Sequence, residues 1–169
     1  VVPKVLRELM ADGLLIDYTH RIPERMVELI RNHQLPAIWI NSRQESDCVY
    51  PDDYDAARRA TEYLLQLGHT RIAYVDYVHL KHEAGQHYSV PERRNGYEAA
   101  MRQAKAKTCF IGDASVPLKD RLEHIKNYVC SPASPTALLC YSPDDATLAF
   151  MACAQCNKQV PRDLSLVSF

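Results

Sequence analysis

Residues 56–75, AARRATEYLLQLGHTRIAYV, constrain the fold more than any other stretch of this chain. Apolar side chains recur there at helical spacing and predict one buried helical stripe, formed by Ala57, Ala60, Leu64 and Leu67. Gly68 can adopt the left-handed conformation that ends such a helix. Residues 72–75 are a short apolar run, typical of a strand covered on both faces. A helix followed at once by a buried strand is half of a parallel βαβ unit.

The rest of the chain repeats this alternation. Helices are expected at 3–10, 23–32, 53–67 (capped by Asp52 or Asp53), 92–104, 118–129 and 144–156. Strands are expected at 13–17, 37–41, 48–50, 72–75, 108–111, 136–141 and 164–169. This order predicts an α/β fold with parallel, doubly wound sheets. Ligands of such sheets bind beyond the carboxyl ends of the strands, so the residues that follow each strand are the candidates.

Charge and apolar content limit the partners of the chain. Its 169 residues carry a formal net charge of −1, so nothing indicates a surface for nucleic acid or an anionic membrane. No apolar run approaches the roughly 20 residues of a membrane span, and we expect no membrane partner. The chain starts at Val1 without an initiator methionine and ends on a predicted strand, so we expect a fragment of a longer protein.

Six cysteines, at positions 48, 109, 130, 140, 153 and 156, match no small disulfide framework. Cys153 and Cys156 form a C-x-x-C near the end of a predicted helix. The helix dipole that lowers the thiol pKa of redox pairs acts at the other end, so a redox or metal role is disfavoured. We therefore expect reduced thiols and a cytoplasmic location.

Motifs for catalysis are absent from the sequence: it contains no G-x-S-x-G, P-loop, H-E-x-x-H or G-x-G-x-x-G. His79, His82 and His87 share a long polar loop, where a solvated loop is favoured over a metal site because no regular spacing fixes the ligands. Asp144 and Asp145 follow a predicted strand, and a helix-capping role is favoured over a catalytic pair. We expect no enzyme, no cofactor and no metal.

Arg93 stands out among the polar residues by its position. It starts a predicted helix, after a loop that leaves the carboxyl end of strand 72–75. Its guanidinium offers a planar fork of donors that suits paired hydroxyls or a carboxylate. From spacing alone, a surface salt bridge is the favoured alternative.

Six stretches follow one another in a recognisable order: DGLLI at 12–16, PAIWIN at 36–41, LGHTRIAYV at 67–75, RRNGY at 93–97, PTALLC at 135–140 and VPRDLSLVSF at 160–169. Together they resemble the effector-binding core of the lactose/galactose repressor family (LacI/GalR). The LGH-RIA segment is the most specific match. The resemblance covers essentially the whole chain and is carried by the order and spacing of the motifs.

This resemblance implies a two-lobe, periplasmic-binding-protein-like (type I) fold, in which each lobe is a parallel doubly wound sheet that is incomplete here. Residues 1–50 would form part of the N-terminal lobe, and residues 51–169 a C-terminal lobe that is incomplete at its end. A small-molecule cleft would lie between the hinged lobes. The first lobe would lack a strand that should lie centrally, leaving backbone groups unpaired.

The resemblance also implies a set of ligand-binding residues. Arg93 matches the arginine of the family that holds effector hydroxyls or a carboxylate. Asn41 matches a polar first-lobe residue that faces the cleft, and Ser142 stands where the family usually has asparagine. Ser89 and His87 lie in the loop that lines the cleft mouth.

Departures from the family pattern concern the same site. Pro143 replaces the usual aspartate, so Asp144 is either a displaced substitute or only a cap. Ala114 stands where several members place an aromatic platform. The chain stops just before an aspartate that commonly binds effector, and the DNA-reading headpiece would lie upstream.

The resemblance therefore favours the ligand-sensing domain of a transcriptional regulator. A small-molecule effector, expected to be a sugar or sugar derivative, would close the lobes of a homodimer and control DNA binding by an upstream helix-turn-helix headpiece. The alternative is a periplasmic sugar-binding protein of a transport system. The six cysteines and the LGH-RIA motif argue against this alternative. A flavodoxin-like or sugar-isomerase enzyme is disfavoured because no acid/base pair or phosphate loop can be defended.

Overall fold

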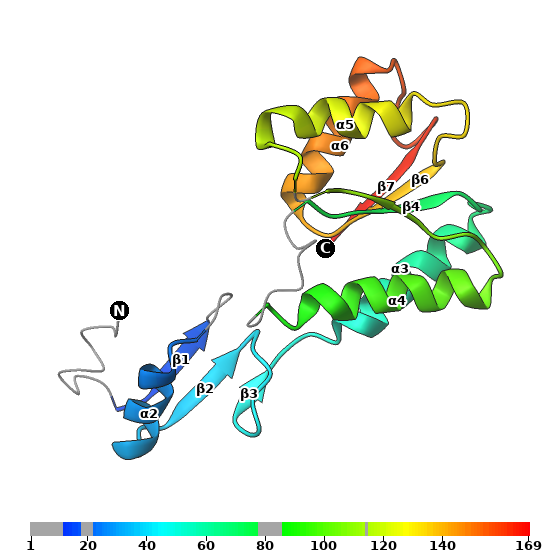
Figure 1. The fold of residues 1–169 in the computed structure, drawn as a ribbon. Coiled ribbons are helices and arrows are strands. Elements are labelled where there is room, and N and C mark those ends of the chain that lie inside the picture. Colours follow the sequence, from blue (N-terminus) through cyan, green and yellow to red (C-terminus); the bar gives the residue numbers. More distant parts are fainter. Residues whose placement is uncertain (1–11, 18–21, 78–85, 114) are drawn as a thin grey trace. The chain divides into compact units, whose positions relative to one another are not determined.

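A computed structural model describes residues 12–17, 22–77, 86–113 and 115–169. The chain divides into two compact units, Val1–Asp52 with Glu83–Tyr88, and Asp53–His82 with Ser89–Phe169. Each unit contains one parallel sheet (Figure 1). The helix expected at 3–10 lies outside the described residues. Among the residues that are described, no helix has the length and apolar character needed to cross a membrane.

The first unit is a three-stranded sheet with one helix. The strands are β1 (Leu14–Asp17), β2 (Ala37–Ile40) and β3 (Cys48–Val49), and the helix is α2 (Glu24–Asn32). Met26 and Ile30 of α2 pack against Trp39 of β2 and form the buried core of this unit. The opposite face of the sheet carries exposed apolar side chains, those of Leu15, Ile38, Ile40 and Val49.

Strand pairing in this first sheet bears on one expectation, which stays a prediction because a further strand could pair at the edge of β1. We expected the sheet to lack a strand in a central position. Within the described strands no gap occurs, because β1 pairs directly with β2 and β2 with β3, all in parallel. The order is β1-β2-β3, so β1 lies at an edge.

The second unit is a four-stranded parallel sheet in the order β5-β4-β6-β7. Its strands are β4 (Ile72–Val75), β5 (Cys109–Ile111), β6 (Ala137–Cys140) and β7 (Ser165–Ser168). Its helices are α3 (Asp53–Gln66), α4 (Ser89–Gln103), α5 (Arg121–Val129), which follows the short 3-10 turn η1 (Leu118–Asp120), and α6 (Pro143–Gln155). Helices α3 and α4 cover one face of the sheet, and α5 and α6 cover the other (Figure 1). The predicted doubly wound α/β arrangement is thus confirmed in this unit.

The stretch at 56–75 folds largely as its pattern predicts, but Leu67 is wrongly placed in the helical stripe, because it follows the end of α3 and is 56% exposed. Helix α3 ends just before Gly68, whose φ of 90° is left-handed. All four residues of β4 are buried. Asn157, after α6, likewise has a left-handed φ of 54°.

Helix α4 begins at Ser89, three residues before the expected start at 92. The earlier start is compatible with Pro91, because proline is tolerated in the first helical turn, where its missing N–H would be unpaired anyway. The start matters for function, because it places both Ser89 and Arg93 within the first turns of one helix.

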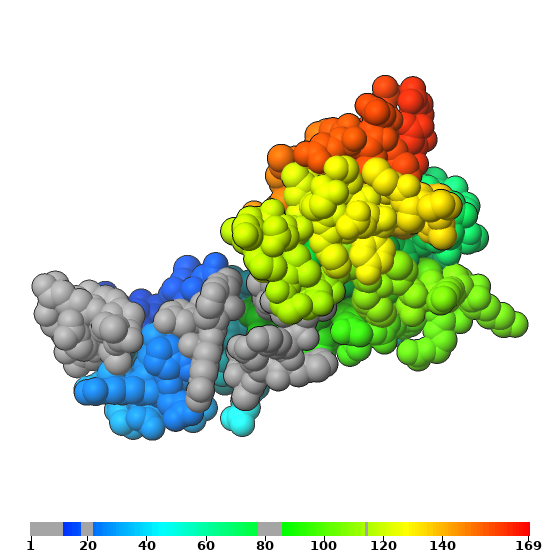
Figure 2. Space-filling model, turned by 45° about the horizontal axis from the view of Figure 1, so that its top comes forward, coloured from blue at the N-terminus to red at the C-terminus, as the bar shows by residue number. Residues whose placement is uncertain are grey.

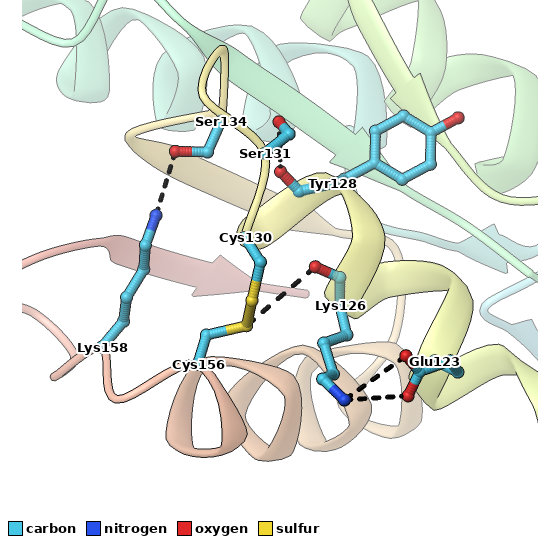
Figure 3. Close-up of a disulfide and its surroundings, with 8 residues drawn as sticks. All are labelled: Glu123, Lys126, Tyr128, Cys130, Ser131, Ser134, Cys156 and Lys158. Atoms are coloured by element: carbon cyan, nitrogen blue, oxygen red, sulfur yellow. Dashed lines mark hydrogen bonds and ion pairs between the residues drawn. A yellow bond between two sulfur atoms is a disulfide. The ribbon is translucent and has the colours of Figure 1, made fainter.

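The cysteines depart from expectation. Cys130 and Cys156, each directly after the last residue of α5 and α6, form a disulfide with Cα atoms 6.0 Å apart (Figure 3). The expectation of reduced thiols is therefore wrong for this pair. Cys153 stays a free, buried thiol, so the C-x-x-C is not itself a disulfide. Spacing could not reveal the pair, because its 26-residue separation closes only when α5 and α6 pack together.

Candidate functional site

Polar side chains of the second unit gather where β4 and β6 end. Asp76 follows β4, Tyr141 and Ser142 follow β6, and the first turns of three helices add further groups. Those helix residues are Asp53 of α3, Ser89 and Arg93 of α4, and Asp145 of α6. The carboxyl ends of parallel strands are where sheets of this type bind ligands.

Arg93 is held on several sides. Its Nε donates to Asp53 Oδ1 at 2.6 Å, and its Nη1 donates to the Tyr141 carbonyl oxygen at 2.8 Å. The guanidinium carbon also lies 4.7 Å from the centroid of the Tyr141 ring and 4.6 Å from that of Phe169. The Arg93 side chain is 20% exposed and that of Asp53 only 3%. Arg93 thus makes a salt bridge, but a largely buried one, and keeps a route to solvent.

Ser89 and Tyr141 form a second polar contact beside Arg93. Their hydroxyl oxygens lie 2.8 Å apart, and both residues are buried. Burial raises the pKa of the Tyr141 hydroxyl, against a smaller opposing effect of its hydrogen bond with Ser89. The phenol therefore stays neutral near pH 7 and can both donate and accept a hydrogen bond.

Ser142 is the N-cap of α6. Its hydroxyl accepts from the Asp145 N–H at 3.2 Å and donates to Asp145 Oδ2 at 2.8 Å. Burial raises the pKa of Asp145 to about 6, and the nearby charge of Asp76 adds to this shift. Asp144, by contrast, is exposed in the first turn, where its charge complements the helix dipole.

In the first unit, the structure brings together two of the predicted residues. His87 Nε2 donates to the carbonyl oxygen of Asn41 at 2.7 Å, just beyond the end of β2. The Tyr88 hydroxyl donates to Asn41 Oδ1 at 3.2 Å, and Tyr88 stacks edge-on against Tyr50 with ring centroids 5.3 Å apart. The guanidinium of Arg43 lies over both rings, 5.1 and 5.4 Å from their centroids.

Sequence reasoning missed several of these contacts. Asp53 was expected to be at most a helix cap, whereas its carboxylate holds Arg93, 40 residues away. Tyr141 and Phe169 were not singled out, although both lie at or just beyond the end of a strand, which is a usable signal. Arg43, Tyr50 and Tyr88 were missed in the first unit.

Part of the histidine loop and the position expected for an aromatic platform lie outside the described residues. Among the loop histidines, His79 and His82 lie outside the described residues, as does Ala114. Within the ranges that are described, no group of three or more His, Cys, Asp or Glu side chains is arranged to hold a metal ion.

Comparison with known proteins links this geometry to a family. The family model for the periplasmic binding protein-like domain matches residues 61–169. The chain is 23% identical to the transcriptional repressor PurR of Aliivibrio salmonicida and 28% identical to the transcriptional regulator RegA of Clostridium saccharobutylicum, in each case over 98% of this chain and 50% of the relative. The chain therefore spans about half the length of these curated relatives.

Solved structures show the same fold. A LacI family regulator from Enterococcus faecium with bound ribose matches with a TM-score of 0.75 at 21% identity, covering 98% of this chain and 60% of that one. A sugar-binding regulator of the LacI family from Escherichia coli, complexed with phosphate, matches with a TM-score of 0.74 at 21% identity, covering 98% of this chain and 59% of that one.

Proposed function

This chain belongs to the periplasmic binding protein-like domain family, in the form found in LacI-family regulators, and from this premise we propose that it senses a small molecule for a transcriptional regulator. One observation carries the proposal. Arg93, Ser89 and Tyr141 place hydrogen-bonding groups together at the carboxyl ends of β4 and β6, on a rigid sheet with helices on both faces. Such a cluster suits recognition of a small polar ligand.

A carbohydrate or a derivative of one is the effector that we propose. Sugars offer several hydroxyls that donate and accept in turn, which matches the mixture of guanidinium, hydroxyl and carboxylate groups around Arg93. The ribose-bound regulator from E. faecium, which shares the fold, supports this choice. Asn41, His87 and Ser142 are proposed as further ligand contacts.

Signalling would follow from differential binding. An effector that binds one conformation of a regulator better than another shifts the balance between them, and otherwise it switches nothing. We propose that this chain acts in a cytoplasmic homodimer, whose DNA contacts are made by a helix-turn-helix headpiece outside the present sequence. The names of the curated relatives, which are transcriptional regulators and repressors, support this assignment.

Substitution of Arg93 tests the proposed ligand-binding function. In Arg93→Ala, affinity for the effector, sought by calorimetry with D-ribose and other common sugars, should fall about tenfold or more, because a charged hydrogen bond is lost. Arg93→Lys keeps the charge that Asp53 needs but loses the planar fork, so it separates loss of recognition from loss of stability. Arg94→Ala, which removes a surface ion pair with Glu98, is the matched control.

An unchanged affinity in Arg93→Ala and Arg93→Lys would remove Arg93 from the site. Circular dichroism and the melting temperature of each variant check that the fold is kept, because Arg93→Ala leaves the buried carboxylate of Asp53 without its partner.

A sugar-binding protein of a transport system is the second candidate. The Cys130–Cys156 disulfide favours it, because disulfides are typical of oxidising compartments outside the cytoplasm. Cell fractionation separates the two candidates: recovery of the protein in the periplasm would support transport, and specific retention on operator DNA would support regulation.

A further inference from the structure

The contact of Asp53 with Arg93 affects which ligands the site can bind. We propose that Asp53 is a specificity-determining residue, which sets Arg93 to receive neutral, hydroxyl-bearing molecules and to reject carboxylates and phosphates. The inference rests on the proposed ligand-binding function of this site. It concerns which class of effector the site accepts.

Two of the five N–H groups of Arg93 are already engaged. Binding a carboxylate or phosphate in bidentate fashion requires two adjacent N–H groups of the guanidinium. Here Nε is engaged by Asp53 and Nη1 by the Tyr141 carbonyl. The edge formed by Nε and Nη2 therefore has its Nε–H occupied, and Nη1 has given one of its two N–H groups to the carbonyl. Among the described residues, only Nη2 of this guanidinium has no hydrogen-bond partner.

The charge of Arg93 is also balanced. Asp53 Oδ1 lies 2.6 Å from Nε, and both side chains are largely removed from solvent. An incoming anion would meet a neutral pair rather than a free cation, and the carboxylate of Asp53 would lie next to the guanidinium that it approaches. Like charges brought together out of water repel strongly.

Further carboxylates lie at the same strand ends. Asp76 and Asp145 are buried there, and Asp145 feels the charge of Asp76. With Asp53 they make three carboxylates, against the guanidiniums of Arg93 and of Arg121, which lies near Asp145. The local balance therefore disfavours a ligand that brings another negative charge.

A hydroxyl group fits what remains. The second oxygen of Asp53, Oδ2, is buried and has no hydrogen-bond partner among the residues that the structure describes. A buried acceptor without a donor is costly, and a ligand O–H can satisfy it. The same hydroxyl group can accept from an N–H of Arg93, because a hydroxyl both donates and accepts. A carboxylate or a phosphomonoester dianion offers no donor from its charged group and leaves Asp53 Oδ2 unpaired.

The experiment is a titration of the full chain with methyl phosphate, whose dianion carries no O–H, at ionic strength held constant with sodium chloride. Asp53→Asn keeps the shape of the side chain and removes its charge. Its affinity for methyl phosphate should exceed that of the parent by about tenfold or more, because a like charge next to the anion is removed. Calorimetry measures the affinity, and the rise in melting temperature with methyl phosphate provides a second readout.

Two further variants control for a general effect of removing a carboxylate and for failure of Asp53→Asn to fold. Asp55→Asn removes a carboxylate from the same helix, but one that is 37% exposed and paired with Arg58, so its affinity for methyl phosphate should equal that of the parent. Asp53→Ser also removes the charge and suits a helix start, and it serves if the asparagine variant does not fold.

A parent chain that binds methyl phosphate as tightly as both Asp53 variants overturns the inference. So does a parent chain that prefers D-ribonate to D-ribose, although ligand binding itself would then stand. If the Asp53 variants gain affinity for methyl phosphate while no sugar binds the parent, the role of Asp53 is supported and the proposed carbohydrate effector is contradicted.

Discussion

At the scale of single residues, Asp145 places a carboxylate inside the second unit. Its side chain is 1% exposed, and burial raises its pKa from 3.8 to about 6. The folded state therefore binds this proton more tightly than the unfolded chain does. Between about pH 4 and pH 6 the folded form holds more protons, so this group makes stability fall as pH rises, and above pH 6 the cost is constant.

Asp145→Asn should remove that cost. The amide keeps an oxygen that can accept from Ser142, so the free energy of unfolding at pH 7.5 should rise by about 2–3 kcal/mol. Urea denaturation at a series of pH values measures it. The gain should shrink as the pH is lowered from 6 toward 4, and it should vanish only well below the unfolded pKa of 3.8, where the carboxyl of the parent is protonated in both states.

Asp144→Asn is the control, because Asp144 is exposed and follows the same proline. Parallel stability curves for the parent and Asp145→Asn across pH 4–7.5 would show that Asp145 is not a buried, proton-binding carboxyl.

At the scale of elements, Gly96 determines how closely α4 approaches α3. A Cβ atom at Gly96 would lie 2.3 Å from the Tyr54 carbonyl oxygen and 2.9 Å from the Cβ of Ala57. The nearest obstacle is backbone, which cannot turn aside as a side chain can. The glycine of the R-x-x-G-Y motif is therefore required by helix packing.

Gly96→Ala should destabilise the protein by about 1–3 kcal/mol, the usual cost of overpacking a core. The sign is diagnostic, because the same change in an open helical position stabilises by up to about 1 kcal/mol. Asn95→Ala, at the exposed neighbouring position, is the control and should change stability only slightly. A more stable Gly96→Ala protein would mean that the two helices are not in this close contact.

At the scale of the whole molecule, the two sheets differ in how well they are covered. In the second unit, β4 and β6 are buried along their full length between helices on both faces. In the first unit, one sheet face carries α2 and the other carries exposed apolar side chains. Resistance to local opening rises with the buried contacts of an element.

Amide hydrogen exchange should therefore be slowest in β4 and β6 and clearly faster in β1 and β2. Mass spectrometry of peptides from each strand, corrected for intrinsic exchange rates, measures the difference. Equal protection of the two sheets would contradict the view that covering of both faces controls their opening.

Much of the architecture could be predicted because it depends on neighbours along the chain. The apolar stripe at 56–66, the stop at Gly68 and the four-residue strand after it follow from periodicity and backbone preference, which act over a few residues. The same local signals located most other helices and strands to within a few residues.

What the sequence by itself determined was the alternation of helices and parallel strands and the ordered motifs that indicate the family. Only the tertiary structure decided the order β5-β4-β6-β7, the disulfide between Cys130 and Cys156, and the pairing of Arg93 with Asp53. These contacts join residues 26 and 40 positions apart. No local preference encodes them, because they form only when distant elements pack against one sheet and exclude water around the groups that meet there.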